Sequence, residues 1–94
     1  MHAVVTEVNV DASREEEARE LLNDVVVPQA KQFDGFVAGR WLRALEGERG
    51  VAVIFFSSEQ AARAAVERAR SEGPPPGGPV SMQSIDLFEV IAEA

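Results

Sequence analysis

Val51-Ala52-Val53-Ile54-Phe55-Phe56 is a run of six apolar residues with no polar residue among them. Side chains along a β-strand point alternately to the two faces of the sheet. A strand with one solvent-exposed face therefore alternates apolar and polar residues. This run places apolar side chains on both faces, whichever register it takes. We therefore expect a strand over residues 50–56 that is covered by protein on both sides.

The rest of the chain predicts three more strands and two helices. Alternating or apolar-rich segments at residues 2–10, 36–45 and 80–91 are typical of strands. Apolar residues recur at helical spacing after Ser13 and again after Ser57. The resulting order, β-α-β-β-α-β, predicts an α+β protein of the ferredoxin-like class, with a four-stranded antiparallel sheet and two helices on one face.

The expected helix boundaries follow from local chemistry. Ser13 with Glu16, and Ser57 with Gln60, have the spacing of capping boxes, in which the two side chains satisfy free backbone N–H groups. Pro28 lacks a backbone N–H group and disfavours helical geometry in the residue before it. We therefore expect the first helix to kink or break at Pro28.

The second face of this sheet has nothing in the chain to cover it. The strand at 50–56 presents either Val51, Val53 and Phe55 or its other three residues there, and an apolar patch of that size is rare on a soluble monomer. Burial of apolar surface contributes ~25 cal/mol of stability per Å², which favours pairing two such sheets face to face. The closed arrangement is a two-fold dimer, so the sequence predicts a homodimer formed through the sheet face.

Length and composition narrow the class of protein. Ninety-four residues are enough for a single domain, spanning residues 1–94. The net charge of −7 argues against binding to nucleic acid or to an anionic membrane surface. No apolar run approaches the roughly 18 residues of a membrane span and no signal peptide is apparent, so we expect a cytoplasmic protein. Arginine supplies eight of the nine basic residues, a bias typical of high-GC bacterial genomes.

Metal and cofactor sites are not expected. The chain has no cysteine and one histidine, His2, next to the N-terminus. This inventory excludes thiolate sites and disfavours a histidine metal site or a haem ligand within the fold. No phosphate-binding glycine motif or nucleophile elbow is present either.

Three segments of the chain resemble the antibiotic-biosynthesis-monooxygenase-like branch of the dimeric α+β barrel superfamily. They are residues 8–13 (Val-Asn-Val-Asp-Ala-Ser), 33–39 (Phe-Asp-Gly-Phe-Val-Ala-Gly) and 55–61 (Phe-Phe-Ser-Ser-Glu-Gln-Ala). The resemblance extends over nearly the whole chain. It implies that two sheets pair into a barrel with a cavity in each half. Proteins of this kind include cofactor-independent oxygenases, haem-degrading enzymes and many proteins of unknown activity.

Four residues, Asn9, Arg40, Trp41 and Asp86, are candidates for a catalytic site, and Arg43 is weighed beside Arg40. Trp41, the only tryptophan, could stack on a flat aromatic substrate, or it could be a core or interface residue. Arg40 or Arg43, whichever faces the cavity, could hold an anionic group, or could be solvated. Asn9 could polarise an oxygen atom. Asp86 could be a cavity acid, or could form a structural ion pair with Arg40 across the sheet.

The resemblance also limits the chemistry. Haem-degrading relatives use an asparagine, a tryptophan and a helix-borne histidine, whereas this chain offers Asn9 and Trp41 and has its histidine at position 2. Quinone-forming relatives use a tyrosine, which this chain lacks.

Two functions remain open at this point. The first is cofactor-independent oxidation of a small aromatic or polyketide-like compound. The second is a non-catalytic ligand-binding or assembly module. An open pocket with converging polar groups favours the enzyme, and a closed core favours the module.

Overall fold

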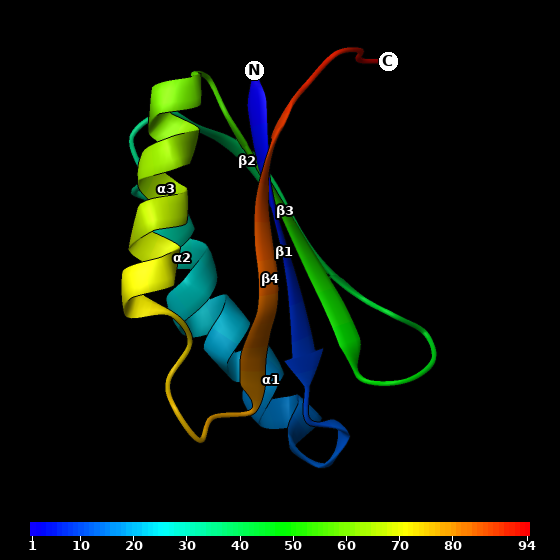
Figure 1. Cartoon of the computed structure of the whole chain (residues 1–94). Coiled ribbons are helices and arrows are strands. Elements are labelled where there is room, and N and C mark those ends of the chain that lie inside the picture. The colour runs from blue at the N-terminus through cyan, green and yellow to red at the C-terminus, as the bar shows by residue number, and fades with distance from the viewer.

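The computed structural model describes all residues, 1–94, and contains one four-stranded antiparallel sheet. The strands lie in the order β2-β3-β1-β4, so the first and third strands form the centre of the sheet (Figure 1). Their bounds are β1 His2–Val10, β2 Phe36–Arg43, β3 Arg49–Phe56 and β4 Val80–Glu89.

Two helical segments lie on the same side of the sheet (Figure 1). The first is made of short pieces that follow one another along the chain: the 3₁₀ turn η1 Ala12–Arg14, α1 Glu15–Leu21, the π-helical turn η2 Leu22–Val26 and α2 Val27–Lys31. The second is α3, Glu59–Glu72. This architecture confirms the predicted ferredoxin-like α+β class.

The helix caps differ from the predicted capping boxes. The first helical segment is capped by Asp11, whose carboxylate accepts hydrogen bonds from the backbone N–H and the hydroxyl of Ser13, at 3.0 and 2.6 Å. The second is capped by Ser58, whose hydroxyl accepts the N–H of Ala61 at 3.1 Å. The predictions of Ser13 and Ser57 as caps were therefore wrong by two residues and one residue respectively.

The sequence predicted a kink or a break at Pro28. The chain does not break there, since helix continues through α2, and it widens one turn earlier instead. In a regular α-helix the proline ring would collide with the carbonyl of Asp24 and leave it without a donor. Here residues 22–26 form a π-turn, in which the N–H of Val27 reaches the carbonyl of Leu22, five residues back. Such turns are often found at functional sites.

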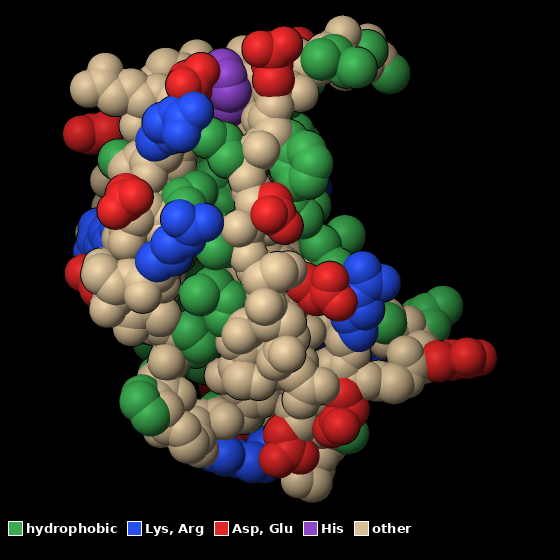
Figure 2. All heavy atoms as spheres, viewed as in Figure 1, with side chains coloured by type: hydrophobic (Ala, Val, Ile, Leu, Met, Phe, Trp, Pro, Cys, Tyr) green, Lys and Arg blue, Asp and Glu red, His purple; other side chains and the backbone are tan.

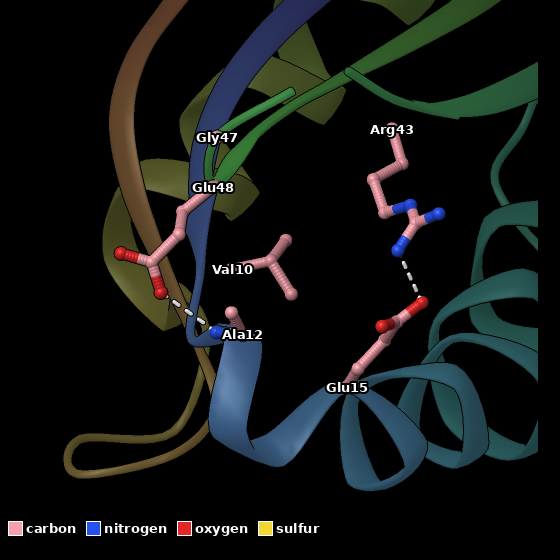
Figure 3. Close-up of a pocket in the computed structure, with 6 residues that line it drawn as sticks. All are labelled: Val10, Ala12, Glu15, Arg43, Gly47 and Glu48. Atoms are coloured by element: carbon pink, nitrogen blue, oxygen red, sulfur yellow. Dashed lines mark hydrogen bonds and ion pairs between the residues drawn. The ribbon is translucent and has the colours of Figure 1, made fainter. Parts of the chain in front are cut away.

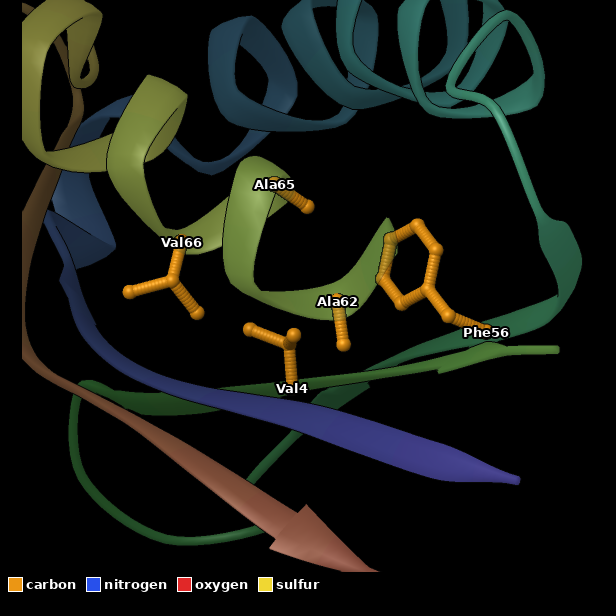
Figure 4. Packing of buried hydrophobic residues seen from close by; sticks show 5 residues of the cluster. All are labelled: Val4, Phe56, Ala62, Ala65 and Val66. Carbon is orange, nitrogen blue, oxygen red and sulfur yellow. The ribbon is translucent and has the colours of Figure 1, made fainter. Parts of the chain in front are cut away.

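The hydrophobic core lies between α3 and the centre of the sheet. Phe56 is fully buried, and Val4, Ala62, Ala65 and Val66 pack around it (Figure 4). The helix residues are small, so α3 can lie close to β1, β3 and β4. The first helical segment touches the sheet mainly between α2 and β2, and this looser contact leaves space beneath it.

The strand register decides which side chains face the helices. On β1, β3 and β4 the paired residues Val4, Ile54 and Leu87 pack against α3, so their neighbours Val5, Val53 and Asp86 face away from it. A bulge in β4 at Gln83 reverses the alternation there. Met82 therefore shares the helix side with Ile85, and not the side of Ser84 that strict alternation predicts.

The side of the sheet without helices, called here the open face, is apolar at its centre. The register places these apolar side chains there: Ala3, Val5, Ala38, Leu42, Val51, Val53, Phe55 and Phe88. Figure 2 shows hydrophobic side chains on both sides of β4, in the furrow beside α3 and along the uncovered side. Only 10 of the 94 residues are buried in the single chain, and Leu42 and Phe88 remain 54% and 52% exposed.

Candidate functional site

A cavity of about 680 Å³ lies between the first helical segment and the sheet. Its walls come from β1–β4, the helices and the loop after α3, and 17 of its 28 lining residues are hydrophobic. The π-turn contributes directly, since Leu22, Val25 and Val26 line the cavity. A volume of this size accommodates a small organic molecule.

Aromatic rings form part of the cavity wall. Trp41 is half-buried on β2, and its indole lies over Gly39, where an added Cβ would come within 2.9 Å of the ring. Phe33, on the turn after α2, stacks on Phe56 with ring centroids 6.3 Å apart. The guanidinium of Arg68 lies over the ring of Phe33, 5.1 Å from its centre. Trp41 therefore offers a flat apolar surface to a ligand, whereas the ring of Phe33 is already contacted by Phe56 and Arg68.

Charged groups gather at the edge of the cavity. Glu15 on α1 accepts hydrogen bonds at the same oxygen, Oε1, from Arg43 on β2 and from Arg19 on α1, the latter at 3.0 Å. The Arg19 hydrogen bond, followed by the charge of Arg43, holds the pKa of Glu15 below its usual value. On α3, Arg68 pairs with Glu72 at 3.0 Å.

The contact between Glu15 and Arg43 joins α1 to β2 beside a much smaller pocket of about 30 Å³ (Figure 3). A space of that size holds about one water molecule. Glu48, in the β2–β3 hairpin, accepts the backbone N–H of Ala12 at 2.7 Å and so ties the hairpin to the start of the first helical segment. This end of the cavity is therefore fastened by two links between helix and sheet.

The proline-rich loop after α3 forms another part of the rim. Gly73, Pro74 and Pro75 line the cavity. The loop is held at its far end, where Arg14 donates to the carbonyl of Gly77 at 2.8 Å. This contact ties the loop to the first helical segment.

The four predicted site residues lie on opposite sides of the sheet. Trp41 lines the cavity. Asn9, Arg40 and Asp86 are exposed, and the register places them on the open face. Arg40 donates to the carbonyl of its own neighbour Gly39 at 2.8 Å. It forms no ion pair with Asp86, because β2 and β4 are the two edges of the sheet, about 14 Å apart.

Several cavity residues were not identified from the sequence. Arg19, Arg68 and Glu15 lie on helices whose charged residues read as ordinary solvated side chains. One signal was available: Arg68 follows Ala61 by seven residues and Ala65 by three, so it belongs to the apolar stripe of α3. A cation in that stripe indicates a charged group at the edge of the buried face.

Three observations concern the histidine, metal sites and membrane-spanning helices. His2 lies at the start of β1 beside Glu59, with 3.7 Å between Nε2 and Oε1, and does not line the cavity. No group of three or more His, Cys, Asp or Glu side chains is arranged to hold a metal ion. None of the helices is long and apolar enough to cross a membrane.

Comparison with known proteins finds matches among solved structures. No family model matches the sequence, and no curated protein matches it. The haem degrader MhuD from Mycobacterium tuberculosis, solved with two haems in its active site, superposes with a TM-score of 0.77 at 20% identity, over 100% of this chain and 99% of that one.

Two further structures share the fold. A monooxygenase from the gene ActVA-Orf6 of Streptomyces coelicolor, in complex with nanaomycin D, gives a TM-score of 0.64 at 20% identity, over 99% of this chain and 89% of that one. A dimeric ferredoxin-like protein from an uncultured marine organism superposes with a TM-score of 0.69 at 9% identity, over 100% of this chain and 98% of that one. These likenesses, at 20% identity or less, show that the chain shares the overall fold of these proteins.

Proposed function

We propose that this protein is a homodimeric monooxygenase-like protein that binds a small aromatic or polyketide-like compound in the cavity between its sheet and its first helical segment. The observation that carries the proposal is the cavity itself. It combines a volume of about 680 Å³ with a predominantly hydrophobic lining that includes the rings of Trp41 and Phe33. Convergence of an apolar pocket with a few polar groups is the usual form of a ligand site.

The cavity chemistry favours a metal-free organic compound over haem. Protein ligands of haem iron are histidine, cysteine, methionine or tyrosine. Of these types, only Met82 lines the cavity, while the single histidine lies elsewhere on β1. A haem in this cavity would therefore find no imidazole ligand.

The proposed reaction is oxidation by dioxygen of a ring system with an activated methylene group, for which anthrone is a model. It would proceed without the tyrosine that quinone-forming relatives use, because this chain has none. Loss of one proton to solvent water gives an enolate. The enolate carbon adds dioxygen, and the resulting peroxide takes up one proton from solvent to form a hydroperoxide. The hydroperoxide loses water to leave a quinone, so one dioxygen is consumed and one water is released. The positive charge of Arg43 and Arg19 favours the enolate, because it stabilises the negative charge that develops on the enolate oxygen.

The homodimer is proposed on the open face. Leu42, Phe88 and the apolar side chains between them are exposed in the single chain and would be covered by an equivalent sheet. The superposition with a dimeric ferredoxin-like protein supports a dimer. The proposal places Asn9, Arg40 and Asp86 inside the barrel, apart from the cavity that Trp41 lines.

A second candidate function is a ligand-binding module without catalysis. One observation favours it: both carboxylates that line the cavity, Glu15 and Glu72, are already paired with arginines. Neither is therefore free to act as a general base without first losing a partner.

One experiment separates these functions. Dioxygen uptake is measured with anthrone in the presence and absence of the protein, and binding is measured by quenching of Trp41 fluorescence with anthraquinone-2-carboxamide. Saturable quenching with uptake above the blank supports the oxygenase. Saturable quenching with uptake equal to the blank supports the binding module, and no saturable quenching contradicts the proposed cavity function.

A further inference from the structure

The charge of the cavity lining differs from that of the rest of the protein. Three arginines and two glutamates line the cavity, which gives it a net charge of +1, whereas the whole chain carries −7. Two of the sixteen acidic residues are found there, against three of the nine basic ones. The cavity lining is therefore more positive than the chain as a whole, and an anion inside it meets a net positive charge.

The positive charge is incompletely neutralised. Arg19 and Arg43 both donate to the same Oε1 atom of Glu15, and each does so through a single nitrogen. A guanidinium has five N–H donors, so most of the donors of both side chains remain free. Neither arginine is buried: their side chains are 62% and 50% exposed, and can move without breaking the core.

Arg43 lies beside Trp41 on the same face of β2. Arg43 follows Trp41 by two residues on β2, so both side chains lie on the same side of the strand. Both line the cavity. A planar ring system against Trp41 would therefore place a substituent at its edge within reach of Arg43, which binds carboxylates through two parallel hydrogen bonds.

Resting on the proposed function, we infer that the cavity selects planar aromatic compounds that carry a carboxylate, and that Arg43, assisted by Arg19, is the residue that determines this specificity. Glu15 holds the two guanidiniums in place when the cavity is empty. It also competes with the ligand for them. Arg43 therefore favours carboxylate binding, and Glu15 opposes it.

The test compares two probes of the same shape, anthraquinone-2-carboxylate and anthraquinone-2-carboxamide, by quenching of Trp41 fluorescence. The wild-type protein should bind the carboxylate about tenfold more tightly than the amide, because hydrogen bonds to a charged group are about twice as strong as neutral ones. The ratio should fall at about 1 M salt, where the Debye length is about 3 Å.

Two substitutions with opposite expected signs complete the test. Arg43→Gln should bring the ratio of the two affinities close to one. Glu15→Gln should raise the affinity for the carboxylate severalfold, because the lining then carries +2. The matched control is Arg70→Gln, which changes an exposed arginine of α3 that does not line the cavity. Circular dichroism checks that each variant is folded.

The outcomes separate this inference from the proposed function. If both probes bind the wild type equally well, or if Glu15→Gln weakens the carboxylate as much as Arg43→Gln does, the inferred specificity is wrong while the aromatic cavity stands. A purely structural role of the Glu15–Arg43 contact would give that second result. If neither probe quenches Trp41 saturably, the proposed cavity function fails as well.

Discussion

Replacement of Phe88 by alanine should weaken the dimer more than it weakens the fold of each chain. Phe88 lies on the open face, paired across the sheet with Ala3, and is 52% exposed in the single chain. Full burial of a phenylalanine side chain contributes about 1.5–3 kcal/mol, so about half of that is gained only when a second sheet covers it. Because the two-fold dimer buries two copies, the loss is about 1.5–3 kcal/mol, or an increase of about 10- to 100-fold in the dimer Kd.

Sedimentation velocity across a range of concentrations measures the Kd of the wild type and of Phe88→Ala. The matched control is Leu45→Ala, because Leu45 is 96% exposed in the β2–β3 hairpin and lies off the sheet face. Its dimer Kd should stay within about twofold of wild type. A wild-type protein that stays monomeric at micromolar concentration, or an unchanged Kd in Phe88→Ala, would refute the pairing of open faces.

Three further predictions concern the cavity and the helix caps. Gly39→Ala should displace the Trp41 indole, since a Cβ would come within 2.9 Å of the ring; a shifted emission maximum and weaker anthraquinone binding would show it, and unchanged values would contradict it. The pKa of Glu15 is lowered from 4.5, so its contribution to stability is present above about pH 4.5 and is lost as the pH falls through the lower folded value. Urea unfolding of wild type and Glu15→Gln should therefore converge in acid. Ser58→Ala should cost about 1 kcal/mol of unfolding free energy, and Ser57→Ala much less, if Ser58 is the cap of α3.

Most of the fold could be predicted from the sequence because its signals are local. The expected strand at residues 2–10 matches β1, His2–Val10, and its apolar side faces the helices. The order of elements and the antiparallel sheet follow from periodicity and handedness. The expected end of the second strand was two residues too late, at Leu45, because the hairpin begins after Arg43.

The errors arose where neighbouring parts of the structure override local rules. Pro28 disfavours a helix, but a π-turn at residues 22–26 absorbs it, and nothing in a one-dimensional pattern shows that turn. The bulge at Gln83 moves Met82 to the opposite side of β4. Sequence periodicity assumes strict alternation, so it cannot anticipate such a change.

The site was predicted only in part, for a related reason. Choice of strand face depends on register, and a shift of one residue moves every side chain to the other side. The sequence therefore identified Trp41 as a candidate, but it could not predict which face of the sheet its side chain occupies. Polar residues on strands drew attention to Asn9 and Asp86, whereas the charged groups of the cavity come largely from helices, where exposed arginines and glutamates are common.

A crystal structure of the protein with anthraquinone-2-carboxylate tests the central claim most directly. We predict that the ring system lies between the sheet and the first helical segment, against Trp41, with its carboxylate within hydrogen-bonding distance of Arg43. The ligand would contradict the account if it lay instead between two open faces, beside Arg40 and Asp86.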